Sequence, residues 1–208
     1  LQLGRVRDLS IADGKRLVFS AVGRLYEMDL PSGTPRRLTS GGDLEYAPAF
    51  SPDGRSIAYV TWNDREGGHV WVLPTGGTPR RVTQESAQYA NPSFASDGSR
   101  IVYLKGSGAT FRGNDPGDEL WHEVHWAPAE GGASHYVIGV KNRGQNRRMA
   151  RPTFSADGQR IFYIDDEDAK PTEVPRTTLS SVRLDGTDAR AHLRWPKAEE
   201  AAVSPDAR

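Results

Sequence analysis

The chain has 208 residues, of which 36% are hydrophobic and 26% charged; this is polar for one compact core and suits many thin sheets with solvated rims. The 27 basic and 27 acidic residues balance, so net charge favours neither nucleic acid nor an anionic membrane as a partner. The lack of cysteine excludes disulfides, thiolate metal sites and a cysteine nucleophile, and no stretch approaches the ~20 apolar residues of a membrane span.

The first predicted unit covers residues 5–41. Its DLSIADGKRLVFS run places Leu17 and Phe19 two residues apart after the Asp13-Gly14 pair, and RLYEMDLPSGTPRRLT follows at residues 24–39. Alternation of aliphatic and aromatic residues with period 2 is typical of strands. The unit therefore predicts strand, Asp-Gly turn, strand, loop, strand, Gly-rich turn and strand.

The second predicted unit covers residues 45–85. Its PAFSPDGRSIAYV run contains the turn sequence Ser51-Pro52-Asp53-Gly54, followed by Ile57 and Tyr59. Proline presets φ at the second position of a turn, and glycine accepts positive φ at its end. HVWVLPTGGTPRRVT then supplies two more strands around a Gly-rich turn. We therefore expect four antiparallel strands and no helix across Ile57–Val72.

The third and fourth predicted units cover residues 89–140 and 150–195. Their PSFASDGSRIVYL and PTFSADGQRIFYI runs align without gaps with the second unit, and residues 201–208 end in VSPDAR, the approach to a fifth turn. The aspartates of these turns, Asp13, Asp53, Asp97, Asp157 and Asp206, are spaced by 40, 44, 60 and 49 residues. Propeller blades repeat at roughly 40–50 residues, so this spacing indicates a propeller.

These repeats predict an all-β fold in which residues 1–208 form part of a β-propeller, with four four-stranded antiparallel blades and the start of a fifth. Stacked blades bury both faces of each thin sheet, which one sheet cannot do alone. An open β-sandwich is the alternative fold, although it does not require a repeated unit of this length. The chain opens at Leu1 and stops inside the fifth unit, so we expect an incomplete, open propeller.

An open arc would leave flat apolar faces on its first and last blades, and such surfaces favour association. We therefore expect self-association, or contact with the rest of the parent polypeptide or another protein. A closed ring of four blades is the alternative, because propellers of about four to eight blades exist. In that ring Ala201–Arg208 would pair with the first sheet as a closing strand.

Three irregular stretches interrupt the repeats: Gly106–Glu119, Lys141–Met149 and Asp165–Arg176. Loops can present functional residues on a rigid scaffold, but they also tolerate insertions, and both interpretations stay open. The carboxylates of Asn114–Glu119 and Asp165–Asp168 lack the alternating ligand spacing of a calcium loop. We interpret both groups as solvated acidic loops.

The segment Trp121–Trp126, WHEVHW, resembles a zinc HExxH motif but is one residue short. It aligns with a predicted strand, in which His122 and His125 point to opposite faces. Zinc needs converging ligands, so we predict no zinc at this pair. His125 aligns with Trp71 of the second unit, which favours packing between blades.

Arginines recur in pairs and in one insertion. Neighbouring residues of a strand alternate between its faces, so each pair places only one guanidinium on a given side, and we interpret these residues as solvated surface. They are Arg36, Arg37, Arg80, Arg81, Arg143, Arg147 and Arg148.

The sequence contains no G-x-S-x-G elbow, no P-loop, no dinucleotide-binding G-x-G-x-x-G motif and no H-x-H pair among its five histidines. We therefore predict no catalytic, cofactor-binding or metal-binding residues in this chain, and no cofactor.

The repeated FSPDG-[RK]-x-I-A-Y pattern resembles the TolB-like propeller repeat of bacteria over nearly the whole chain. Such blades occur in periplasmic TolB and in several multidomain hydrolases, so this resemblance implies the fold and leaves the role open. The runs GRLYEMDLPSGTPRRLT, GGHVWVLP, QYANPSF and SVRLDGTDARAHLR carry a narrower resemblance. It is to the propeller segment that precedes an amidohydrolase domain in large bacterial proteins.

The narrower resemblance implies a non-catalytic segment that scaffolds or gates a metal-dependent amidohydrolase. Any hydrolase activity would then belong to another part of the polypeptide, because the H-x-H metal motif of that family is missing here. Two alternatives remain: a TolB-type adaptor that binds another protein, and a ligand-binding module with its site at the axial channel. The resemblance also implies a periplasmic or otherwise exported location, and neither nucleic acid nor membrane insertion is expected.

Overall fold

Sixteen β-strands make up the regular structure of the described residues. The structure is a computed structural model that describes residues 7–106, 121–141, 150–167, 172–173 and 176–196. The strands form four antiparallel sheets of four strands each, and every sheet consists of consecutive strands. The predicted all-β architecture of four-stranded repeats is therefore confirmed, and each sheet is one blade.

Blade 1 comprises β1 (Arg7–Ala12), β2 (Arg16–Ala21), β3 (Arg24–Asp29) and β4 (Arg36–Arg37). Blade 2 comprises β5 (Leu44–Phe50), β6 (Ser56–Trp62), β7 (Val70–Pro74) and β8 (Arg80–Arg81). Blade 3 comprises β9 (Tyr89–Phe94), β10 (Arg100–Gly106), β11 (Trp121–Pro128) and β12 (His135–Lys141). Blade 4 comprises β13 (Thr153–Phe154), β14 (Arg160–Asp166), β15 (Arg176–Arg183) and β16 (Arg190–Pro196).

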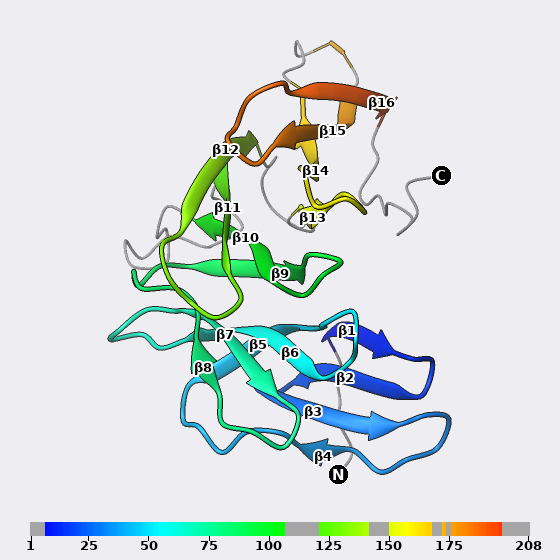
Figure 1. Cartoon of the computed structure of the whole chain (residues 1–208), viewed down its shortest axis with the longest axis vertical. Coiled ribbons are helices and arrows are strands. Elements are labelled where there is room, and N and C mark those ends of the chain that lie inside the picture. The colour runs from blue at the N-terminus through cyan, green and yellow to red at the C-terminus, as the bar shows by residue number, and fades with distance from the viewer. Residues whose placement is uncertain (1–6, 107–120, 142–149, 168–171, 174–175, 197–208) are drawn as a thin grey trace.

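The blades follow one another along an arc, with blade 1 and blade 4 at its two ends (Figure 1). The first strands of successive blades, β1, β5, β9 and β13, lie next to one another, so they line the inside of the arc. Strands β6 and β7 occupy the stretch from Ile57 to Val72, which confirms that no helix crosses it. Among the described residues, no helix has the length and apolar character that a membrane crossing needs.

The Asp-Gly pairs of blades 2, 3 and 4 form equivalent hairpin turns, as predicted. Gly54, Gly98 and Gly158 each donate an N–H to the carbonyl three residues earlier, over 2.8, 2.9 and 2.8 Å, and their φ angles are 66°, 72° and 66°. In each turn the aspartate carboxylate accepts the N–H of the residue two positions later. A serine hydroxyl also donates to each carboxylate and is the main reason why its pKa lies below the usual range. These bonds explain why aspartate precedes glycine at the turn.

Blade 1 has a shorter turn than the other blades. Ala12 pairs with Arg16 across three residues, whereas four residues separate Ser51 from its partner in blade 2. The first strand of blade 1 is therefore offset by one residue from the sequence alignment, which explains why this unit matches the others only loosely before its turn. As a result, Asp8 rather than Arg7 occupies the position of Ala47.

Each blade packs through two faces, which we call the preceding face, toward the blade before it, and the following face, toward the blade after it. The aliphatic and aromatic residues after each Asp-Gly turn lie on the preceding face. Tyr59 packs against Leu25 of blade 1. Blades 2 and 3 share the buried cluster of Ala58, Val60, Val70, Val72, Ile101 and Tyr103, and blades 3 and 4 share that of Val102, Leu104, Val124, Ile161, Tyr163 and Val182.

The two end faces of the arc keep large apolar side chains exposed. On the preceding face of blade 1, Leu9 and Ile11 are 57% and 58% exposed. On the following face of blade 4, Leu193 is 53% exposed and lies opposite Leu179 in the ladder. The core of the chain therefore lies mainly between blades. On the preceding face of blade 1, Leu9 and Ile11 are exposed while Phe19 is buried at 2% exposure, so this face is only partly uncovered.

Candidate functional site

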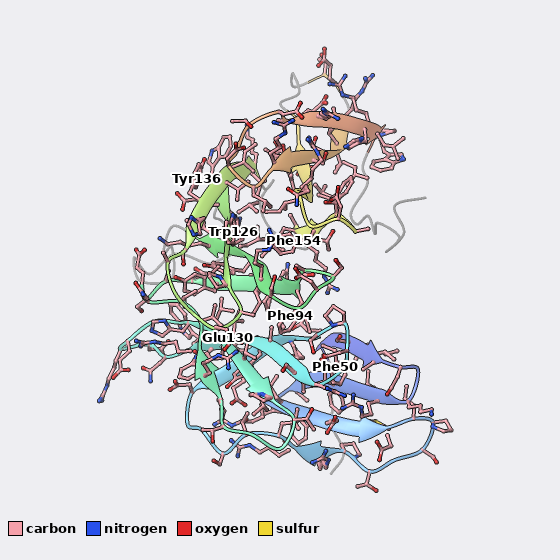
Figure 2. The ribbon with its side chains drawn as sticks, in the orientation of Figure 1. Phe50, Phe94, Trp126, Glu130, Tyr136 and Phe154 are labelled. Atoms are coloured by element: carbon pink, nitrogen blue, oxygen red, sulfur yellow. The ribbon has the colours of Figure 1, made fainter. Side chains whose placement is uncertain are left out.

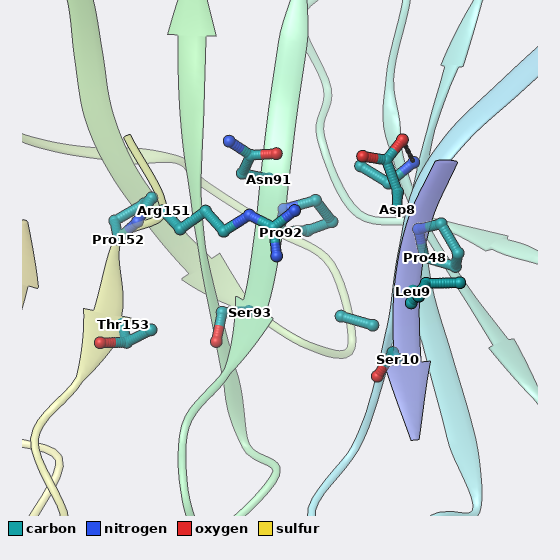
Figure 3. A pocket seen from close by; sticks show the side chains of 12 residues that line it. Asp8, Leu9, Ser10, Pro48, Asn91, Pro92, Ser93, Arg151, Pro152 and Thr153 are labelled. Carbon is teal, nitrogen blue, oxygen red and sulfur yellow. Dashed lines mark hydrogen bonds between the residues drawn. The ribbon is translucent and has the colours of Figure 1, made fainter. Parts of the chain in front are cut away.

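A cavity of about 210 Å³ lies between the first strands of the four blades, at the axial position of the propeller (Figure 3). Three consecutive residues from each blade line it. They form a first ring of Asp8, Ala47, Asn91 and Arg151, a second ring of Leu9, Pro48, Pro92 and Pro152, and a third ring of Ser10, Ala49, Ser93 and Thr153.

Irregular backbone sets the first ring apart from the regular ladder. The pairing register shifts at this point in β1, β5 and β9, and Asp8, Ala47 and Asn91 have φ angles of 50°, 48° and 48°. Proline follows directly in blades 2 and 3, which suits a bulge because proline has no N–H to give to the ladder. Bulges of this kind re-aim side chains and are found next to functional sites.

The polar groups of the cavity belong mainly to the first ring. The Asp8 carboxylate accepts hydrogen bonds from the Ser20 hydroxyl at 3.3 Å and the Ala47 N–H at 3.4 Å, so blades 1 and 2 both hold it. The Asn91 amide donates to the carbonyl of Ala150 at 2.8 Å. The Arg151 side chain extends from blade 4 toward blade 3 (Figure 3). One cavity is thus lined by a carboxylate and a guanidinium from the two ends of the arc.

This combination of groups suits a small ligand that carries both charges. A carboxylate attracts a cationic group, and a guanidinium can bind a carboxylate through two parallel hydrogen bonds. The volume of about 210 Å³ lies below the roughly 300–1,000 Å³ of typical ligand pockets. The cavity therefore fits a small zwitterion or one side chain, and not a large substrate.

The two histidines of the WHEVHW segment lie in β11 and are both buried. His125 pairs with Tyr103 as Trp71 pairs with Tyr59, and its ring stacks on that of Tyr103 with centroids 6.2 Å apart. The structure therefore places His125 on the preceding face, between blades 2 and 3, as the alignment indicated. Strand parity places His122 on the following face.

The chemistry at His125 is that of a packed side chain. Burial lowers the pKa of His125, against the opposing effect of a Glu123 carboxylate 2.7 Å from its Nε2 atom. Among the residues that the structure describes, no three His, Asp or Glu side chains are grouped so that they could hold a metal ion. The prediction about zinc at this pair stays a prediction.

The described part of the acidic stretch Asp165–Asp168 is bonded to neighbouring strands. Asp165 accepts the N–H of Lys141 at 2.7 Å, and burial raises the pKa of Asp165. The threonine hydroxyls of β15 donate to Asp166 and Glu167. These carboxylates are thus half-buried anchors rather than the fully solvated loop that the sequence suggested. Asp168 and the stretch Asn114–Glu119 lie outside the described residues.

Two of the predicted surface arginines connect elements. Arg80 donates to the carbonyl of Ala129 in blade 3 at 2.9 Å, and Arg36 pairs with the buried Glu27. Arg37 donates to the carbonyl of Gly41, and Arg81 is exposed. Arg143, Arg147 and Arg148 lie outside the described residues, as do residues 107–119 and 142–149 of the two insertions.

Sequence reasoning did not identify the residues of the axial cavity. The cavity draws on four short segments that lie 39 to 60 residues apart in sequence, and no motif joins them. The residue directly before each aligned proline could have indicated this ring. It is Ala47, Asn91 and Arg151 in the second, third and fourth units. Its counterpart Asp8 was hidden by the shorter turn of blade 1.

Comparison with known proteins shows the fold. No family model matches the sequence, and no curated protein matches it. Among solved structures, a putative TolB from Agrobacterium tumefaciens matches with a TM-score of 0.64 and 21% identity over 90% of this chain. TolB from Acinetobacter baumannii matches with a TM-score of 0.58 and 23% identity over 86% of this chain. The propeller of the Trilobed protease from Pyrococcus furiosus has an open velcro topology. It matches with a TM-score of 0.59 and 10% identity over 92% of this chain.

These solved chains are longer than the present one. The chain spans 61% of the Agrobacterium TolB, 40% of the Acinetobacter TolB and 57% of the Pyrococcus propeller. The identities are too low to transfer an activity, and the shared property is the arrangement of blades. The chain therefore shares the β-propeller fold of these structures, including the two TolB proteins.

Proposed function

We propose that this segment is a non-catalytic scaffold or gate within a larger bacterial protein of the amidohydrolase type. The observation that carries the scaffold role is the apolar preceding face of blade 1. Leu9 and Ile11 on this face are 57% and 58% exposed. In blades 2 to 4 the same face packs against the blade before it, and its second-strand isoleucines are at most 4% exposed, whereas their counterpart in blade 1, Leu17, is partly exposed.

Apolar surface of this kind favours a covered state. Removing it from water stabilises the covered state by roughly 25 cal/mol per Å², and contiguous exposed patches usually mark contact sites. The hydrolase assignment is supported by the sequence resemblance described above. In this proposal the propeller arc packs against further polypeptide, and the catalytic groups lie in that further polypeptide.

The scaffold role is tested in the full-length protein with Ile11→Glu and the control Val22→Glu. Val22 is 80% exposed in a hairpin turn, so a charge there disturbs no interface. We expect Ile11→Glu to lower both the melting temperature and the hydrolase activity of the full-length protein, and the control to lower neither. Equal behaviour of the two variants would contradict the proposal.

A second candidate function is ligand binding at the axial cavity, which the presence of both Asp8 and Arg151 in its first ring favours. The probes are free amino acids and dipeptides, which carry an ammonium and a carboxylate. Isothermal titration should detect binding to the chain that Asp8→Asn and Arg151→Gln each weaken at least about tenfold. Binding that both variants retain, or no binding at all, would rule out this site.

We also propose that the protein is exported, because the TolB proteins that it resembles are periplasmic. Cell fractionation of the source bacterium with an antibody against this segment is the test. We expect the protein in the fractions that contain periplasmic or extracellular marker proteins. Its recovery in the fractions with cytoplasmic markers would contradict the proposal.

A further inference from the structure

The outer hairpin of blade 3, formed by β11 and β12, carries a pair of exposed aromatic side chains. Among the large apolar side chains that the described part of the chain exposes, only Trp121 and Tyr136 are aromatic, at 55% and 56% exposure. They lie on paired strands and on the same face as His125, and Figure 2 labels Tyr136 at the outer edge of the arc. Large aromatic rings favour burial, so their exposure as a pair marks this surface as a candidate contact site.

The lengths of the strands explain why blade 2 does not cover these rings. Blade 2 ends in β8, which has two residues, whereas β11 and β12 have eight and seven. Along one ladder row of blade 3, exposure increases outward: Tyr89 is buried, the Lys105 side chain is 20% exposed and the Glu123 side chain is 51% exposed. Lys105 still pairs with Glu85, which follows β8, at 2.8 Å. The outer hairpin thus extends beyond the cover that blade 2 provides.

A glycine forms the floor between the two aromatic rings. A carbon atom at the Cβ position of Gly139 would lie 3.8 Å from Trp121 Cε3 and 3.8 Å from Tyr136 Oη, which is ordinary van der Waals contact. A ligand carbon that rests on this glycine would therefore touch both aromatic side chains at once. Glycine weakens the interior of a strand, and it often marks a site where a ligand approaches the backbone closely.

Two opposite charges border the aromatic pair. Glu123 lies opposite Gly139 in the ladder, and its Oε2 atom accepts a hydrogen bond from Nε2 of the buried His125 at 2.7 Å. This bond holds the carboxylate in place, and a carboxylate has about four acceptor positions, so others remain for a ligand. Lys141 lies opposite Trp121, with its ammonium 5.7 Å from the centroid of that ring. The surface therefore combines apolar ring faces with an acceptor and a donor.

We propose that this surface binds a saccharide, with one pyranose ring stacked on Trp121 and Tyr136 above Gly139. The C–H groups of a pyranose form an apolar face that is attracted to the negative face of an aromatic ring. Its hydroxyls both donate and accept, so they suit the carboxylate of Glu123 and the ammonium of Lys141. This binding site is independent of the proposed scaffold role.

Two other classes of occupant fit the surface less well. A cationic ligand would also suit exposed aromatic rings and a carboxylate, but the Lys141 ammonium already lies beside Trp121 and would repel it. An apolar protein segment would remove both charges from water without giving them hydrogen bonds, which is costly. A neutral, hydroxylated ring avoids both penalties.

Isothermal titration of the full-length protein with chitotriose, cellotriose and maltotriose tests the site. We expect at least one of them to bind and sorbitol, which has hydroxyls but no ring, not to bind. Trp121→Ala should weaken the binding at least about tenfold, because it removes a stacking ring. The control Trp62→Ala, which removes a partly exposed tryptophan of blade 2, should leave the affinity unchanged. Equal effects of the two variants, no binding of any trisaccharide, or binding of sorbitol or tetramethylammonium that Trp121→Ala abolishes would overturn the proposal.

A substitution of the floor separates binding from folding. Gly139→Val adds a branched side chain between the rings, and its Cβ atom would meet nothing closer than 3.8 Å. Valine suits a strand better than glycine, so the melting temperature should stay equal or rise, while saccharide binding falls at least about tenfold. A stable variant that binds as tightly as the wild type would contradict the site, and if the variant is unstable, Trp121→Ala decides. Failure of either test would leave the scaffold test with Ile11→Glu unaffected.

Discussion

The glycine that ends each Asp-Gly turn is a contact point between blades as well as a turn residue. A Cβ atom at Gly54 would lie 2.6 Å from Arg16 Nη2, and one at Gly158 would lie 2.6 Å from Arg100 Nη2. A Cβ atom at Gly98 would meet nothing within 4 Å, because blade 2 has Ser56 where blades 1 and 3 have arginine. The same turn thus has two environments, depending on one residue of the blade before it.

This difference predicts unequal costs for two identical substitutions. Gly54→Ala and Gly98→Ala both place alanine at positive φ, which costs about 1–2 kcal/mol. The Arg16 guanidinium donates a hydrogen bond to the carbonyl of Gly54 at 2.6 Å. Only Gly54→Ala displaces this guanidinium, which adds about 1 kcal/mol. Urea denaturation should therefore show Gly54→Ala as the less stable variant. Equal stabilities would mean that the arginine contact contributes nothing.

Val22 occupies a turn position that suits another residue better. It has a φ of 53°, is followed by Gly23 at 66°, and is 80% exposed. Two such residues make a type I′ turn, for which Asn-Gly is the preferred pair, while a β-branched residue is strained there. Val22→Asn should raise the free energy of unfolding by about 1 kcal/mol. A loss of stability would show that Val22 makes a contact that this account omits.

His125 makes the stability of the chain depend on pH. Burial lowers the pKa of His125 in the folded state, so folding favours the neutral ring. Its contribution is present in full above the unfolded-state pKa of about 6.5 and is lost as the pH falls through the lower folded-state pKa. Between pH 8 and pH 5, the wild type should therefore lose more stability than His125→Gln. Parallel pH profiles from chemical denaturation would contradict this.

At the scale of elements, the energy of each blade depends on which face is covered. Ile101 and Leu17 have the same position in their second strands, but Ile101 has 0% exposure between blades 2 and 3, whereas Leu17 is partly exposed on an end face. Ile101→Ala should cost about 2–5 kcal/mol because it leaves a cavity. Leu17→Ala should cost about 1 kcal/mol or less. Thermal unfolding of both variants at low concentration checks this, and similar costs would mean that blade 1 is covered on both faces.

Much of the blade architecture can be predicted from local patterns. An Asp-Gly turn followed by an aliphatic and an aromatic residue requires only neighbours in sequence, so the strands and equivalent turns were predictable. Period 2 gives each strand two faces, but it does not say which face meets which blade. For this reason the bridging roles of Arg16 and Arg80 emerged only from the structure.

The axial cavity was beyond sequence reasoning for a different reason. Its first ring depends on bulges at Asp8, Ala47 and Asn91. A bulge shifts the alternation of side chains between the two faces of a strand, so the sequence pattern no longer predicts which face a residue occupies. The one-residue deletion in the turn of blade 1 then moved Asp8 out of alignment. The charged pair of Asp8 and Arg151 exists only once four blades have been placed around one axis.

At the scale of the whole molecule, the chain is an arc of four repeated units whose cores lie between the units. Stability in such an assembly is approximately a sum of blade terms and interface terms. Within the described residues, each end blade has one face without a neighbouring blade, and Leu9, Ile11 and Leu193 are exposed on these faces. The scaffold proposal follows from this incomplete pairing.

Small-angle X-ray scattering on the chain tests the open arc most directly. A concentration series extrapolated to zero separates the shape of one chain from any assembly between chains. We expect a profile that fits the arc of Figure 1, with blades 1 and 4 at its ends. A profile that fits a closed four-bladed ring, with blade 4 packed on blade 1 of the same chain, would contradict the account.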